Sequence, residues 1–221
     1  MPRPRTFVGL TGASGHPYAE ALVRALVRAG HDVDLAATSA GLMVLRHELG
    51  VDGGERGERL PDALAGWLGP EVAASVRAYP SDAVGAPAAS GTSLTGGAIL
   101  APCSMGTLAR VALGFSSNLV ERAADVALKE GRRLVLLPRE APLSAIHLEN
   151  MLRLARLGAV ILPCAPGFYH HPRTIDDLVA HVVGKALDRL GIEHGVGARW
   201  KGLEEPPVET GLGSPASGEG R

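Results

Sequence analysis

Short apolar segments alternate with longer segments of helical periodicity along most of the chain. The apolar segments predict β-strands at 6–10, 31–37, 76–79, 98–101, 134–137 and 159–162. Between them, apolar residues spaced three and four positions apart predict helices at 18–29, 40–49, 60–68, 71–76, 118–130, 144–157 and 175–190, with a further helix beginning near Thr107. Strands that alternate with helices in this way predict an α/β domain with a mostly parallel sheet.

The segment Leu134–Glu140 places a charged pair directly after a buried strand. Four apolar residues are followed by Pro138, and then by Arg139 and Glu140. In an open parallel sheet, ligands bind at the carboxyl ends of the strands. A single Arg-Glu pair can simply begin a surface loop, but other predicted strands also end in polar or small residues. We therefore expect Arg139 and Glu140 to lie at a ligand-binding edge.

Three further strand ends carry small and hydroxyl-bearing residues. The first strand leads into Thr11–Gly15, the second into Thr38 and Ser39, and the fourth into Pro102–Thr107. A Gly/Ser loop between a strand and a helix directs backbone N–H groups toward an anion. The Thr11–Gly15 loop lacks the G-x-G-x-x-G pattern and the P-loop lysine, so it suits a single phosphate better than a pyrophosphate. We expect Thr38 to cap the helix that follows it.

Several reactive residue types have simpler structural interpretations. We expect Cys103 and Cys164 to be small buried apolar groups, because no base or cation that would lower the pKa of Cys103 is obvious near it in the sequence. Glu48 is interpreted as a solvated charge near the end of a helix. Neighbours such as His170–His171 point in different directions, and no further ligand lies at metal-binding spacing, so the sequence predicts no metal site.

Composition narrows the class of protein. The chain has 221 residues, of which 46% are hydrophobic and 4% aromatic, and its formal net charge is -1. This balance argues against a nucleic-acid partner. The sequence contains no apolar run of the roughly 18 residues that a membrane span needs. Two cysteines give no disulfide framework, so we expect a cytoplasmic protein. Residues 201–221 are rich in Gly, Pro, Ser and Glu, and we expect them to be a disordered tail.

A set of short motifs, in order and with consistent spacing, resembles the flavin prenyltransferases of the UbiX type. The resemblance runs from the first strand to about Trp200 and leaves only the tail outside. The motifs are Val8–Gly15, Ser90–Thr92, Ala101–Thr107, Arg122–Val126, Leu128–Glu130, Arg132–Glu140 and Phe168–His170. Each motif is weak alone, and together they are specific.

The resemblance implies a single Rossmann-like or flavodoxin-like three-layer domain over residues 1–200. It implies a metal-independent enzyme that transfers a dimethylallyl group from dimethylallyl phosphate or pyrophosphate to N5 and C6 of reduced FMN. The product, prenylated FMN, is the cofactor of UbiD-type decarboxylases. The resemblance also implies a homo-oligomer, typically a dodecamer, with each site formed between subunits.

Site residues follow from the resemblance by position. The FMN-binding residues would be Gly12, Ala13, Ser14, Thr38, Ser104, Met105, Gly106, Thr107 and Arg139. The residues around the prenyl donor would be Ser90, Gly91, Lys129, Glu140, Tyr169 and Lys185. Lys129, Lys185 and the Tyr169 hydroxyl would stabilise the negative charge that develops on the leaving phosphate. We hypothesise that Glu140 takes part in proton transfers around N5 and C6, with the released phosphate as the other candidate base.

Two departures from the family pattern and two alternatives remain. Lys185 stands where the family has Arg, which removes a bidentate phosphate contact and leaves the choice between monophosphate and pyrophosphate open. Thr38–Ser39 replaces the usual Ser-Lys but keeps the hydroxyl. An FMN-dependent cysteine decarboxylase of the same fold is the first alternative, although such enzymes carry an Asn within the segment that matches Ser104–Thr107 and a His near the Ser90–Thr92 turn. A non-catalytic FMN-binding subunit is the second.

Overall fold

The computed structural model describes residues 3–93, 95–197, 199 and 202. Its strands form one six-stranded parallel sheet in the order β3-β2-β1-β4-β5-β6. The strands are β1 (Arg5–Leu10), β2 (Asp32–Ala37), β3 (Val76–Tyr79), β4 (Thr95–Cys103), β5 (Leu134–Pro138) and β6 (Val160–Ile161). The expected α/β fold class is therefore confirmed, and every pairing between these strands is parallel.

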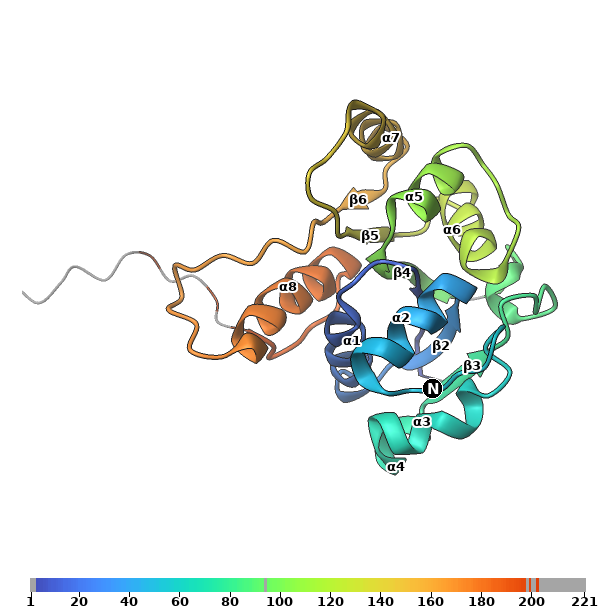
Figure 1. Ribbon diagram of the computed structural model, residues 1–221, viewed down its shortest axis with the longest axis horizontal. Coiled ribbons are helices and arrows are strands. Elements are labelled where there is room, and N and C mark those ends of the chain that lie inside the picture. The colour runs from blue at the N-terminus through green and yellow to red at the C-terminus, as the bar shows by residue number, and fades with distance from the viewer. Residues whose placement is uncertain (1–2, 94, 198, 200–201, 203–221) are drawn as a thin grey trace, which may run out of the picture.

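Helices cover both faces of this sheet and make three layers (Figure 1). The helices are α1 (His16–Arg28), α2 (Ser39–Leu49), α3 (Leu60–Leu68), α4 (Pro70–Ala73), the 3₁₀ turn η1 (Pro87–Ala89), α5 (Met105–Ala112), α6 (Leu119–Lys129), α7 (Ala145–Arg156) and α8 (Ile175–Leu190). One core cluster joins the sheet to α1, α2, α3 and α8. The other joins its opposite face to η1, α5, α6 and α7.

The alternation of side chains along the strands divides the core between these two layers. In β1, Val8 and Leu10 pack toward α1, whereas Phe7 packs toward α6. Successive side chains of a strand point to opposite faces, so a strand buried on both sides reads as a continuous apolar run. This explains why the strand segments of the sequence contain few polar residues.

The strand order reverses between β1 and β4. The chain builds β1, β2 and β3 outward in one direction, then crosses back to add β4, β5 and β6 on the other side of β1. This is the doubly wound Rossmann order, and it opens a crevice beyond the carboxyl ends of the two central strands. The loops that follow β1 and β4 therefore border the position at which such a fold binds ligands.

Most predicted elements are present, with shifted ends. Helix α1 begins at His16, two residues before the predicted start, and α5 begins at Met105 rather than near Thr107. Strand β4 extends beyond the predicted 98–101 at both ends. Most of the predicted tail, residues 203–221, lies outside the described residues, so the division at residue 200 stays a prediction.

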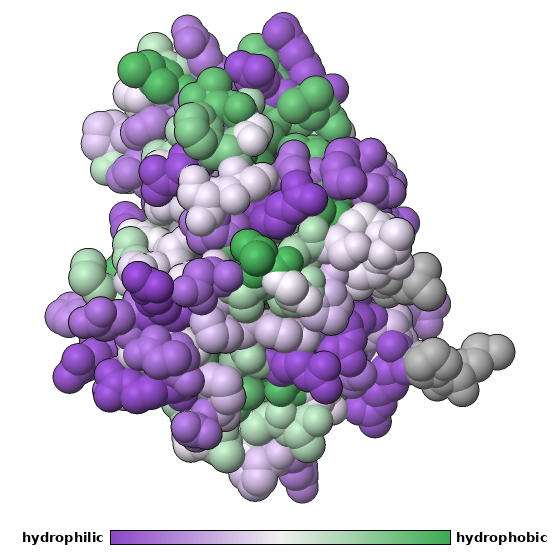
Figure 2. Space-filling model, turned by 90° about the vertical axis from the view of Figure 1, so that its right-hand side faces the viewer, coloured by the Kyte–Doolittle hydropathy of each residue, from purple (hydrophilic) through white to green (hydrophobic). Residues whose placement is uncertain are grey.

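Two parts of the structure extend away from the main body. Helix α7 projects at the top of Figure 1, and the segment 163–174, here called the arm, runs outward between β6 and α8. Large apolar side chains are exposed on and beside α7, and Figure 2 shows apolar surface at this end of the molecule. They include Leu113, Phe115, Leu143, Ile146, Leu148, Leu152 and Leu157. Across the described residues, no helix has the length and apolarity that crossing a membrane requires.

Candidate functional site

The loops after β1 and β4 are fastened to each other by Thr11. Its hydroxyl donates to the carbonyl of Pro102 at 2.8 Å and accepts from the N–H of Ser104 at 2.7 Å. Thr11 is fully buried, so both contacts are shielded from water. This hydroxyl therefore fixes the two loops on either side of the crevice in one relative position.

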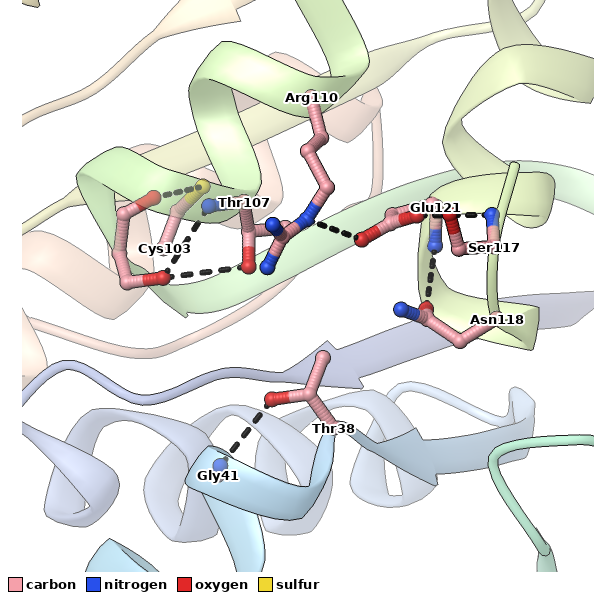
Figure 3. Close-up of polar contacts among 9 residues, drawn as sticks. Thr38, Gly41, Cys103, Thr107, Arg110, Ser117, Asn118 and Glu121 are labelled. Carbon is pink, nitrogen blue, oxygen red and sulfur yellow. Dashed lines mark hydrogen bonds and ion pairs between the residues drawn. The ribbon is translucent and has the colours of Figure 1, made fainter. Parts of the chain in front are cut away.

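Hydroxyl groups also cap the helices that start at this edge (Figure 3). Thr38 accepts from the N–H of Gly41 at the start of α2, at 3.0 Å. Ser104 accepts from the N–H of Thr107 at the start of α5, at 3.3 Å. The expected capping role of Thr38 is confirmed. A cap of this kind satisfies one of the four N–H groups that the first turn leaves without a helical partner, so others remain to bind an anion.

Arg139 brings the end of β5 to the same edge. Its Nε donates to the backbone carbonyl of Ser14 at 3.1 Å, which ties β5 to the Thr11–Gly15 loop. Its neighbour Glu140 is exposed, and its carboxylate accepts from the N–H of Ala141 at 3.1 Å. The structure thus places both residues at the carboxyl edge of the sheet, as expected, with Arg139 turned toward the crevice loops.

The interpretation of Glu48 as a solvated charge is wrong. From the last turn of α2, its carboxylate reaches the start of α1 and accepts from the N–H groups of Gly15 at 3.0 Å and His16 at 2.9 Å. Burial alone would raise the pKa of Glu48, but the Ser14 hydroxyl and these two N–H groups hold the pKa below its usual value. Sequence spacing gave no signal for this contact, because the two segments meet only through the packing of α1 on α2.

This contact also revises the expected anion site. The N-terminus of α1 and its Gly/Ser loop already bind an anion, which is the carboxylate of Glu48. The first turn of α5 is the better position for a phosphate, because its N–H groups lie at the crevice and Gly106 leaves open space around it. Gly12 instead allows the loop to pack closely on α2, because a Cβ at this position would stand 2.6 Å from the Cβ of Ala40.

Cys103 is buried as expected, whereas Cys164 is only partly buried. Cys103 is fully buried at the end of β4, and burial raises the pKa of its thiol to about 12. Burial likewise raises the pKa of the Cys164 thiol to about 12, even though Arg139 acts in the opposite direction. A thiol with so high a pKa is not a nucleophile at neutral pH.

Three of the residues predicted to surround the prenyl donor lie together, but away from the carboxyl edge of the sheet. They are Lys129, Ser90 and Gly91. Lys129 ends α6, just before β5 begins, and its ammonium would stand 3.1 Å from a Cβ placed on Gly91. It pairs with Glu130 at 2.9 Å. Arg139 lies beyond the other end of β5, and a strand of five residues is about 16 Å long. Within one chain, Lys129 is therefore remote from Arg139.

Tyr169 and Lys185 form a second separate group, between the arm and α8. They line a cleft of about 260 Å³ together with His181, Asp188, His194 and Arg199. The ring of Tyr169 makes T-shaped contacts with the rings of His170 and His181, at centroid distances of 5.6 and 5.5 Å. His170 stacks on His181 with 4.8 Å between the ring centroids. Burial is the main cause that lowers the pKa of His181, and the nearby Lys185 adds to it.

The predicted site residues thus fall into three groups. The residues predicted to bind FMN lie at the carboxyl edge of the sheet, together with Glu140. The Lys129 group lies at the opposite edge, and the Tyr169 group lies along α8. The described residues contain no cluster of three or more His, Cys, Asp or Glu side chains that could hold a metal ion.

A doubly wound sheet with hydroxyl-lined loops at its switch point is typical of nucleotide-binding proteins of the α/β class. The model of the Flavoprotein family matches residues 1–187. The flavin prenyltransferase UbiX of Halalkalibacterium halodurans is 50% identical over 193 residues, which cover 87% of this chain and 91% of the relative. The chain therefore belongs to the Flavoprotein family, among the UbiX-type flavin prenyltransferases.

Solved structures agree with this assignment. AnUbiX (PadA1), in complex with FMN and dimethylallyl pyrophosphate, is 37% identical with a TM-score of 0.80, over 92% of this chain and all of that one (100%). A dodecameric FMN-dependent UbiX-like decarboxylase from Escherichia coli O157:H7 is 42% identical with a TM-score of 0.77, over 90% of this chain and 100% of that one.

The crevice loops fit a flavin mononucleotide. The side chains that face the crevice from Gly12–Ser14 and from the start of α5 are small, except for Met105. Arg139 and Thr38 border the same crevice. The N–H groups in the first turn of α5 are donors suited to one phosphate, and the Ser104 hydroxyl beside them donates to the hydroxyl of Thr107 at 3.1 Å. These are the residues that the family resemblance assigns to FMN.

Proposed function

We infer that the protein is a flavin prenyltransferase, which joins a dimethylallyl group from dimethylallyl phosphate or pyrophosphate to N5 and C6 of reduced FMN. The observation that carries this inference is the set of joined loops at the β1/β4 switch point, in a chain that aligns with UbiX-type relatives over most of its length. Bound there, reduced FMN supplies the nucleophilic nitrogen, so the protein needs no nucleophile of its own.

The protein residues at the crevice bind and orient the flavin. Ser104–Thr107 would hold the phosphate at the start of α5, and Thr38 would add a hydroxyl from the neighbouring helix start. Arg139 would lie against the flavin while its Nε fixes the Gly12–Ser14 loop. Holding a reactant in one orientation lowers the entropic cost of the reaction.

Cations and a hydroxyl group around the prenyl donor would assist cleavage of its bond between carbon and phosphate oxygen. Negative charge develops on the leaving phosphate, and Lys129, Lys185 and the Tyr169 hydroxyl can stabilise it. Ser90 and Gly91 form the turn beside Lys129. Glu140, at the end of β5, is proposed to take part in proton transfer between the two substrates. Lys185 would supply positive charge without the bidentate phosphate contact of an arginine.

The separation of these groups supports a site assembled between subunits. Lys129 lies about one strand length from Arg139, and Tyr169 with Lys185 lies on the outer side of α8. Exposed apolar side chains on α7 and the arm, such as Ile146 and Phe168, indicate surfaces that associate with other copies. We propose a homo-oligomer, with a dodecamer as the expected form.

The product is proposed to be prenylated FMN for a UbiD-type decarboxylase in the cytoplasm. The free thiols of Cys103 and Cys164 are consistent with a reducing compartment.

The decisive experiment supplies the purified protein with reduced FMN and either dimethylallyl phosphate or dimethylallyl pyrophosphate under anaerobic conditions. We expect mass analysis to find the flavin heavier by one five-carbon unit with at least one donor. Unchanged flavin with both donors would show that the protein only binds FMN or performs another reaction. Lys129→Ala is expected to abolish the mass change while FMN stays bound.

A further inference from the structure

His181 is a buried imidazole in the cleft between the arm and α8, and the proposed reaction does not use it. Only 7% of the residue is exposed, and it lines the cleft beside Tyr169 and Lys185. Residues four positions apart lie on the same face of a helix, so His181 and Lys185 are neighbours along α8. From the arm, the ring of Tyr169 contacts the ring of His181. His181 therefore lies among the side chains that are expected to hold the phosphate of the prenyl donor.

The neighbours of His181 keep its ring neutral. His170 from the arm stacks on the ring, with 4.8 Å between the two centroids. Burial lowers the pKa of His181, and the charges of His170 and Lys185 lower it further. Each of these influences disfavours the imidazolium. The ring is therefore neutral at neutral pH unless an anion lies beside it.

The carboxylate that lines the same cleft is already paired. Asp188 lies 3.1 Å from Arg199 and 3.2 Å from His194, both from the segment that follows α8. Nδ1 of His194 accepts from the N–H of Val196 at 3.0 Å, so His194 is neutral and its Nε2 is the donor to Asp188. Among the described residues of this cleft, Lys185 then carries a positive charge that forms no ion pair. The cleft therefore suits an anion.

We propose that His181 binds the phosphate of the prenyl donor together with Lys185, in place of an arginine fork, and takes up a proton as that phosphate arrives. This inference rests on the proposed function for the identity of the ligand. The proton comes from solvent and binds a ring nitrogen of His181, and no bond to phosphorus forms or breaks. The imidazolium and the ammonium group then face the phosphate together, and the proton returns to solvent when the phosphate leaves.

Two physical reasons favour a histidine beside Lys185. A lysine supplies one compact charge, whereas an arginine would bind a phosphate through two parallel hydrogen bonds. A protonated imidazole adds a second charged N–H donor, and such charge-assisted bonds are the strong ones. Two permanent cations on one helix face would also repel each other in the absence of ligand. A histidine avoids this cost, because its charge appears only when the phosphate offsets it.

The first test measures proton uptake on binding of inorganic phosphate, without any turnover. The protein is loaded with oxidised FMN, and calorimetric titrations at about pH 7 use two buffers that differ in ionisation enthalpy. We expect the unmodified protein to take up about half a proton per site more than His181→Phe. Protonation of the phosphate itself cancels in this difference. Equal uptake, or no binding of phosphate to the unmodified protein, would overturn the proposal.

The second test measures the KM for the prenyl donor across pH. His181→Phe keeps a ring of similar size without a titratable group, and His47→Phe is the matched control on an exposed histidine of α2. We expect His181→Phe to raise the KM about tenfold at about pH 6, with unchanged FMN affinity. The rise should fade by about pH 9, because the unmodified His181 is then neutral. The control should keep the KM of the unmodified protein.

A second substitution separates charge from packing. Lys185→Arg restores the bidentate contact, so His181→Phe in this background should raise the KM by only about twofold at the same pH. A rise that is equal in both backgrounds, or that is constant with pH, would overturn the proposal, because a packing defect depends on neither. If His181→Phe fails to fold, His181→Gln takes its place. If the unmodified protein forms no prenylated FMN, the proposed function fails, and the calorimetry with phosphate still decides whether His181 binds an anion.

Discussion

Arg139 connects the end of β5 to the flavin loop through one charge-assisted hydrogen bond. Its Nε lies 3.1 Å from the carbonyl of Ser14, and the side chain is exposed toward the crevice. Such bonds contribute about 1.5–3 kcal/mol. We therefore expect Arg139→Ala to weaken FMN binding by about tenfold or more, since 1.4 kcal/mol corresponds to a factor of ten. Quenching of flavin fluorescence during titration measures the dissociation constant.

Arg28→Ala is the matched control for this change. Arg28 is an exposed arginine at the last position of α1, at the end of that helix away from the flavin loop. Its substitution should leave FMN affinity unchanged. Equal weakening in both variants would mean that overall positive charge, rather than the contact with Ser14, governs binding.

Glu48 makes the free energy of unfolding depend on pH in the acidic range. Its pKa in the folded protein lies below the ordinary value of 4.5, because hydrogen bonds to the carboxylate outweigh burial. The stabilisation is therefore present above pH 4.5 and is lost as pH falls through the folded pKa. Glu48→Gln should unfold more easily than the unmodified protein near neutral pH, by about 1–3 kcal/mol.

Urea unfolding at neutral pH and at about pH 4 or below checks this expectation. The difference between Glu48→Gln and the unmodified protein should shrink in acid, because the protonated carboxyl then resembles the amide. A difference that stays constant with pH would show that Glu48 acts by packing rather than by charge.

Among the elements, α8 depends on a capping box where the arm ends. Thr174 accepts from the N–H of Asp177 at 3.1 Å, and Asp177 accepts from the N–H of Thr174 at 2.9 Å. Thr174→Ala should cost about 1 kcal/mol and lower Tm by about 2–4 °C. Thr174→Ser keeps the hydroxyl and should retain most of the stability. Equal losses in a thermal unfolding series would show that the methyl group, rather than the cap, matters.

The elements were predictable where periodicity was strong. Buried runs such as Leu134–Leu137 and the cap at Thr38 are local signals, and the structure confirms them. Element ends were less predictable. Helix α5, for example, begins at Met105 because the Ser104 hydroxyl caps it there. Contacts between elements had no local signal at all. Glu48 meets α1 from 32 positions away in sequence, and nothing near it in the chain indicates that contact.

The order of elements along the chain indicates where Lys129 lies, although the family motifs do not. Lys129 precedes β5 and Arg139 follows it, and the two ends of a strand lie at opposite edges of a sheet. The motifs grouped these residues by chemistry, whereas the topology separates them. That separation is a property of one chain, and it makes the arrangement of several chains the decisive question for the site.

At the scale of the whole molecule, the proposed site requires residues from different subunits. Lys129 would serve a flavin bound by one neighbouring chain, and Lys185 a flavin bound by another. Lys129→Ala and Lys185→Ala should each abolish prenylation in a uniform oligomer. When both variants are co-expressed and mix at random, some sites receive an intact Lys129 from one variant and an intact Lys185 from the other.

Such mixing should restore activity to about a quarter of the sites, because each of the two positions is intact in half of the subunits that supply it. Separately tagged subunits allow the mixed oligomers to be purified, and mass analysis of the flavin counts the product. Co-expression of Lys129→Ala with Arg28→Ala is the control, in which half of the sites should be active. If Lys129 and Lys185 instead came from one chain, every site of the first mixture would lack one of the two lysines. Absence of any restored product in purified mixed oligomers would therefore show that one chain supplies both.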